Sequence, residues 1–121
     1  MDLTTEALRL GITMSRVRAE TASVNIANAD VSGFRTQQVD FGRATGLLRQ
    51  AADDPLMDGA SLRAITARSL GATVHAADAG TSVNLDGEVA ELETAGADFQ
   101  ALTTVMSRRF ALMQLALAGR D

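Results

Sequence analysis

The sequence predicts a mainly α-helical protein whose long N- and C-terminal helices pack as an antiparallel, coiled-coil-like hairpin, with an extended or irregular middle segment and a possible short β arm. Apolar residues near both ends recur at alternating spacings of four and three, the repeat that keeps one helix face toward a partner helix. Hydrophobic residues make up 46% of the chain but aromatic residues only 3%. Ala, Leu, Val and Met must fill the interior, which favours helix–helix contacts over a β-sandwich.

The first helix is expected to begin near Asp2 to Thr5, where short polar side chains can accept hydrogen bonds from free backbone amides. Its apolar stripe continues to about Asn28, which gives a helix of roughly 40 Å at about 1.5 Å per residue. The stripe residues expected to take part in subunit packing are Leu10, Met14, Val17 and Val24.

A turn is expected after this helix, followed by an extended arm. Asp30, Ser32 and Gly33 are turn-forming residues, and Gly33 can adopt a positive φ that other residues resist. Residues 34–41 alternate only loosely between apolar and polar, which indicates extended chain, either a strand or one arm of a short hairpin. Residues 1–41 therefore form the N-terminal helix and turn arm.

Residues 42–82 carry weaker signals. Gly, Ala, Asp and Thr dominate here, and the only proline, Pro55, follows two aspartates. We expect an irregular or flexible segment, with a short strand or helix near Leu62 to Ile65.

The second long helix is expected to occupy most of residues 83–121 and to form one structural domain with residues 1–41. Asn84 can cap its N-terminus, and Asp86 and Glu88 favour the positive end of the helix dipole. Gly96 lies on the stripe, where we expect a close approach of two backbones. The stripe residues expected to take part in subunit packing are Leu85, Val89, Leu92, Phe99, Met106, Phe110 and Met113.

The C-terminal stripe is flanked by further apolar residues, among them Ala95 and Leu102, and Leu112 adds apolar surface beyond it. One partner helix cannot cover so wide a surface, and exposed apolar surface of this size usually marks a contact with another protein. The pattern therefore predicts an assembling protein.

The sequence offers no convincing catalytic, cofactor-binding or metal-binding set. The chain has no cysteine, and His75 is its only histidine. A base formed by His75 with Asp78 lacks a nucleophile motif, and a structural role for a lone histidine is far commoner. The net charge of −4 without a basic patch argues against a nucleic-acid partner. The N-terminus lacks the basic and apolar regions of a cleaved signal peptide, and no apolar run is long enough to insert across a membrane.

One motif resembles a known family. Asn25 and Asn28 end the first helix, Gly33-Phe34-Arg35 follows, and Val39-Asp40-Phe41 comes next. This run is similar to the signature of the bacterial flagellar rod and hook axial family. The segments around Phe99 and Phe110 resemble its proximal-rod branch. The resemblance covers residues 1–41 and 83–121, and within the motif it singles out Asn25, Asn28, Gly33, Phe34, Asp40 and Phe41.

The resemblance implies a structural, non-enzymatic subunit of the proximal rod of the flagellar basal body. Such subunits pass through the flagellar type III export apparatus without a cleaved signal peptide and assemble helically in the periplasm. The implied partners are further copies of the chain and the axial proteins FlgC and FliE together with the ring protein FliF. The alternative is a cytoplasmic helical adaptor or chaperone of flagellar type III export that uses the same amphipathic helices.

Overall fold

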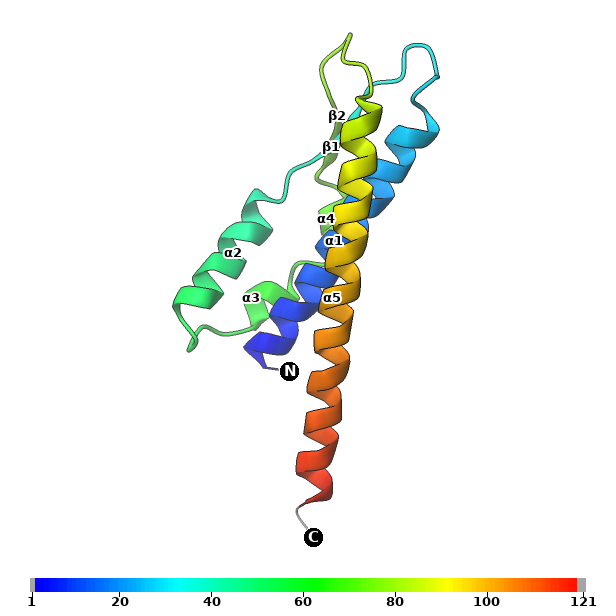
Figure 1. Ribbon diagram of the computed structural model, residues 1–121. Coiled ribbons are helices and arrows are strands. Elements are labelled where there is room, and N and C mark those ends of the chain that lie inside the picture. The colour runs from blue at the N-terminus through cyan, green and yellow to red at the C-terminus, as the bar shows by residue number, and fades with distance from the viewer. Residues whose placement is uncertain (1, 120–121) are drawn as a thin grey trace.

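A computed structural model describes residues 2–119 and shows a mainly helical chain built on two long helices (Figure 1). Helix α1 spans Leu3–Ala27 and helix α5 spans Leu85–Ala118, and the two pack against each other in opposite directions. The expected fold class is confirmed. Both predicted N-caps are confirmed as well: Asp2 accepts a hydrogen bond from the Thr5 amide, and Asn84 accepts one from the Gly87 amide.

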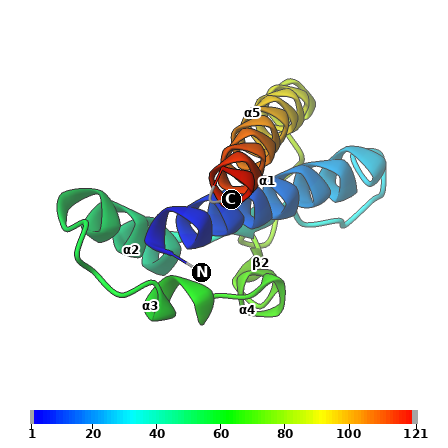
Figure 2. The same ribbon diagram turned by 90° about the horizontal axis from the view of Figure 1, so that it is seen from below.

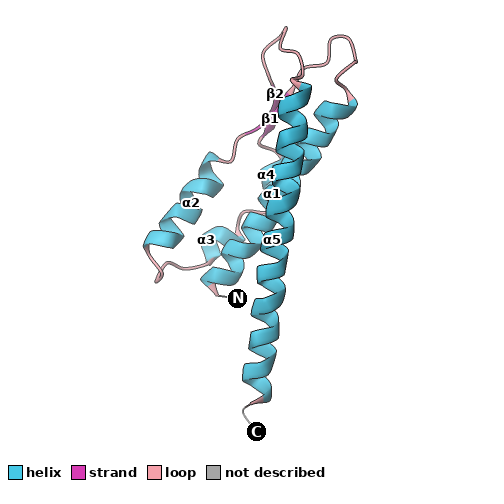
Figure 3. Ribbon diagram, in the orientation of Figure 1, coloured by secondary structure: helices cyan, strands magenta, loops and turns pink. Residues whose placement is uncertain are grey.

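The middle segment is more regular than expected. It contains helix α2 (Gly42–Asp53), helix α3 (Ala60–Arg63), helix α4 (Ala67–Gly71) and strand β2 (Val74–Ala76), as Figure 3 shows by element type. The expected arm contains strand β1 (Gln37–Val39), which pairs with β2 in antiparallel register. Helix α2 places Ala44, Leu47, Leu48 and Ala51 on one face toward the core, a spacing of i, i+3, i+4 and i+7.

The core lies between α1 and the helices of the middle segment. Its buried members are Leu10, Val17, Ala44, Leu62, Ile65 and Leu70. Seen along the molecule, α5 lies on one side of α1 while α2, α3 and α4 lie on the other (Figure 2). Helix α1 is therefore the central element, with two different packing faces.

An ion-pair network holds α3 against α1. Glu6 is only 3% exposed and bonds Arg9 at 2.9 Å and Arg63 at 3.4 Å. Arg9 also donates to the backbone oxygens of Leu62 and Ile65 at 2.7 and 3.0 Å. The Leu62 carbonyl also accepts from the Ile65 amide, so Arg9 adds a second donor there and bonds the Ile65 carbonyl just after α3. The hydrogen bond from Arg9, followed by the charges of Arg9 and Arg63, holds the pKa of Glu6 below its usual value.

Candidate functional site

The candidate site is the α1–α5 helix pair with the part of α5 that extends beyond it. Helix α5 has 34 residues and α1 has 25. Because Arg109 meets the first turn of α1, residues 110–118 continue past the N-terminus of α1 (Figure 1). We call residues 110–118 the overhang.

Arg18 fixes one end of the helix pair. Its Nε lies 2.6 Å from Glu91 Oε1, and its Nη1 lies 2.9 Å from Asp98 Oδ2. These two carboxylates are seven residues apart on α5, so a single guanidinium bridges two turns of the partner helix. The hydrogen bond to Glu91 is the main reason that the pKa of Arg18 is raised above its usual value.

Arg109 fixes the other end. Its Nε donates to Thr5 Oγ1 at 3.0 Å, and its guanidinium forms an ion pair with Asp2. Asp2 also accepts from the Thr5 backbone amide at 2.9 Å. That amide bond, with the Thr5 hydroxyl and then Arg109, lowers the pKa of Asp2. The α1 N-cap and Arg109 of α5 thus form one cluster.

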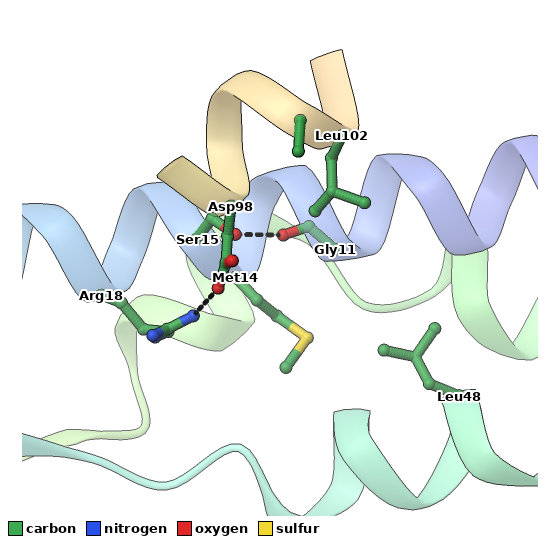
Figure 4. Close-up of a pocket in the computed structure, with 8 residues that line it drawn as sticks. Gly11, Met14, Ser15, Arg18, Leu48, Asp98 and Leu102 are labelled. Carbon is green, nitrogen blue, oxygen red and sulfur yellow. Dashed lines mark hydrogen bonds and ion pairs between the residues drawn. The ribbon is translucent and has the colours of Figure 1, made fainter. Parts of the chain in front are cut away.

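Between the two arginines the helices approach closely at Gly11. A Cβ atom added there would lie 3.2 Å from Leu102 Cδ1, and Figure 4 shows Leu102 directed toward Gly11. The expected close approach at Gly96 is wrong, since no atom comes within 4 Å of a Cβ added there. The glycine that allows the two helices to approach closely is therefore Gly11 on α1, and not Gly96 on α5.

A groove runs beside this contact, with a volume of about 350 Å³. Met14 and Leu48 reach into the space between α1 and α2, and the Arg18–Asp98 ion pair closes one end (Figure 4). The groove carries no group of three or more metal-ligating side chains, and neither does any other part of residues 2–119.

The predicted stripe of α1 faces the middle segment and not α5. Leu10 and Val17 are buried in the core with Leu62, while Met14 packs against its edge. Val24 is 46% exposed. The face that meets α5 is a second one, carrying Thr5, Gly11 and Arg18. The sequence reading missed it because its residues are small or charged.

The predicted stripe of α5 lies beside the face that meets α1, about 90° around the helix from it. Leu92 and Met106 are half-buried. The face that meets α1 instead carries Glu91, Ala95, Leu102 and Arg109. A role in subunit packing stays a prediction for both stripes. The α5 stripe residues that remain exposed are Leu85, Val89, Phe99, Phe110 and Met113.

The turn motif is held by Asn25, which is 1% exposed. Its Nδ2 donates to the Gln37 backbone oxygen at 3.0 Å, and its Oδ1 accepts from the Gln37 amide at 2.8 Å. The side-chain amide thus pairs with β1 as a neighbouring strand would. Asn28 is the C-cap residue of α1 and donates to the Val24 oxygen.

The other motif residues shape the path between α1 and α2. Gly33 has a φ of 79°, which confirms the expected positive angle. Phe34 is half-buried. Asp40 accepts a hydrogen bond from the Gly42 amide at the start of α2, and Phe41 packs against the core. The motif therefore joins α1, the sheet and α2.

Comparison of the chain with protein-family models, curated proteins and solved structures found no match. None of the helices within residues 2–119 combines the length and apolar character needed to cross a membrane. His75 is exposed on β2, and its ring Nδ1 lies 3.2 Å from the Thr73 oxygen.

Proposed function

We propose that this chain is a structural subunit of the proximal rod of the bacterial flagellar basal body, of the FlgB type. It assembles helically into the drive shaft that transmits torque from the membrane ring to the distal rod. The proposal rests on the resemblance of residues 25–41 to the axial family, and on the exposed apolar surface of the overhang.

The overhang is the single observation that carries the assembly role. Every residue from Phe110 to Ala118 is exposed, and none is charged. Leu112, Leu115 and Leu117 are each about two-thirds exposed, at 66%, 68% and 65%. At about 100° per residue these side chains point to different sides of the helix. A helix that is apolar on all sides is typical of a buried position among several neighbours.

A shaft built from such subunits resists twist through many repeated helix contacts. Within each subunit, the arginine contacts at both ends keep α1 and α5 in register, so that the pair moves as one body. The proposed neighbours are further copies, FlgC and FliE on the shaft, and the ring protein FliF. The proposed route is the flagellar type III export apparatus, and the proposed location is the periplasmic rod.

Mass spectrometry of purified hook–basal bodies from the source bacterium tests this proposal. The chain is expected in intact basal bodies and should be lost when the rod is removed. Its recovery only from the cytoplasm, with basal bodies that lack it, would refute the rod role and favour the export adaptor.

A pair of variants tests the mechanism. Phe110→Asp is expected to abolish rod assembly and swimming, because it places an unpaired charge in a contact that must become buried. His75→Ala should swim normally and serves as the control. Normal swimming of the Phe110→Asp strain would contradict the assigned surface.

A further inference from the structure

The link between α2 and α3, residues 54–59, carries an unusually exposed leucine. Leu56 is 93% exposed, more than any other large apolar side chain that the structure describes, and residues 52–56 are all exposed. The Met57 amide donates to the Asp54 oxygen at 3.1 Å, and the Leu56 amide donates to Asp54 Oδ1 at 3.0 Å. These bonds join near neighbours in the chain, so local contacts alone hold the backbone at Leu56.

We propose that the link is a cleavage site in the native protein for an endoprotease that accepts a large apolar side chain, and that the cleaved protein stays folded as two chains. Hydrolysis adds one water across the Leu56–Met57 peptide bond, which leaves a carboxylate on Leu56 and an amino group on Met57. The proposal is independent of the rod function.

The backbone around Leu56 distinguishes it from the other exposed leucines. Exposed loops are the preferred places for proteolytic cleavage, because a helix must unwind before a protease can bind its backbone. Phe34 and Phe41 also lie between elements, but both are half-buried. Three leucines are about two-thirds exposed but belong to helix α5: Leu112, Leu115 and Leu117. Leu56 therefore combines an exposed apolar side chain with a non-helical backbone.

The core would hold the two pieces together. Cleavage at Leu56 separates α1, β1 and α2 from α3, α4, β2 and α5. Strand β1 stays paired with β2 across the cut. The buried cluster draws on both pieces: Leu10, Val17 and Ala44 lie before the cut, and Leu62, Ile65 and Leu70 lie after it. An interface made from a single core divided in two is typical of permanent complexes.

Polar contacts join the same two pieces. Arg9 donates to the backbone oxygens of Leu62 and Ile65 across the cut. Ion pairs also cross it: Glu6 with Arg63, Arg18 with Glu91 and Asp98, and Asp2 with Arg109. None of these contacts uses a residue of the link, so hydrolysis at Leu56 leaves all of them in place.

Limited digestion of the full chain with chymotrypsin tests the proposal. Mass spectrometry should identify residues 1–56 and 57–121 as the first products. The two products should elute together from size exclusion, with the mass of the intact chain by light scattering and unchanged helix content by circular dichroism. A first cut within α5 or after Phe34 would overturn the proposal. Separation of the two products would overturn it too, as would resistance of the native chain under conditions that cleave the urea-unfolded chain.

A pair of variants tests the role of the leucine. Leu56→Ser should slow the formation of the fragment 1–56 roughly tenfold or more, because serine cannot fill the apolar specificity pocket of the protease. Leu115→Ser is the matched control, since Leu115 is 68% exposed but helical. Its digestion should match the wild type in site and rate. Equal slowing in both variants, or no slowing in Leu56→Ser, would overturn the proposal.

Discussion

Replacing Asn25 with alanine should destabilise the protein more than any other change in the turn motif. The side chain is 1% exposed and makes two hydrogen bonds to the Gln37 backbone, at 3.0 and 2.8 Å. Its removal leaves a backbone N–H and a C=O without these partners in a partly buried place. A net hydrogen bond contributes about 1 kcal/mol, and a buried group left unpaired costs about 1–3 kcal/mol. The expected loss is about 2–4 kcal/mol.

The assay is urea unfolding followed by far-ultraviolet circular dichroism, with thermal melting beside it. A domain of this length has a total stability of about 6–18 kcal/mol, so the variant should still fold. Its melting temperature should fall by about 10 °C, since 1 kcal/mol corresponds to roughly 2–8 °C for domains near this size.

Asn28→Ala is the control. The Asn28 side chain is more exposed and makes one hydrogen bond, to the Val24 oxygen at the end of α1. Its loss should cost about 1 kcal/mol or less. If the two variants lose equal stability, the pairing of Asn25 with β1 does not hold the arm, and the reasoning fails.

Two further predictions concern Glu6 and the glycines. The pKa of Glu6 is lowered in the folded state. The stabilisation that the ionised Glu6 carboxylate provides is therefore fully present above pH 4.5, the usual pKa of this group, and is lost as the pH falls through the lower pKa of the folded state. In urea unfolding across pH, Glu6→Gln should be less stable at pH 7 and should lose less stability on acidification; an unchanged acid slope would contradict this. Gly96→Ala should gain about 0.5–1 kcal/mol in urea unfolding, because the added Cβ meets no atom within 4 Å. Gly11→Ala should gain less or lose stability, since its Cβ meets Leu102 at 3.2 Å, and an equal gain at both sites would show that this contact is not tight.

The long helices could be predicted from sequence because their signals are repeated. Asp2 and Asn84 are strong cap residues, and each stripe recurs over several heptads. Gly33 could be predicted because its positive φ suits glycine alone among ordinary residues. These features depend on local chemistry, which the sequence displays directly.

The partners of each stripe could not be predicted in the same way. Helix α2 has only four inward apolar residues, two of them alanine, among several glycines and arginines. Without it, the stripe at Leu10 and Val17 had no visible partner except the C-terminal helix. The bond from Asn25 to Gln37 was equally hidden, since it depends on where the chain returns after the turn.

The two arginine contacts explain how one register of the helix pair is chosen. Sliding α5 by one heptad would place Ala95 or Arg109 where Leu102 now meets Gly11, so the slide would disturb the apolar contact. It would also break the ion pairs. After such a slide Arg18 would face Asp98 and Val105, or Asn84 and Glu91, and would lose one carboxylate. Arg109 would move away from both Asp2 and Thr5. The pairs that are seen, Arg18 with Glu91 and Asp98 and Arg109 with Asp2, exist only in the present register.

Because that register determines where the N-terminus of α1 lies along α5, it also determines the length of the uncharged overhang. The arginines, which contribute little to the core, therefore determine how much apolar helix each subunit offers to a neighbour.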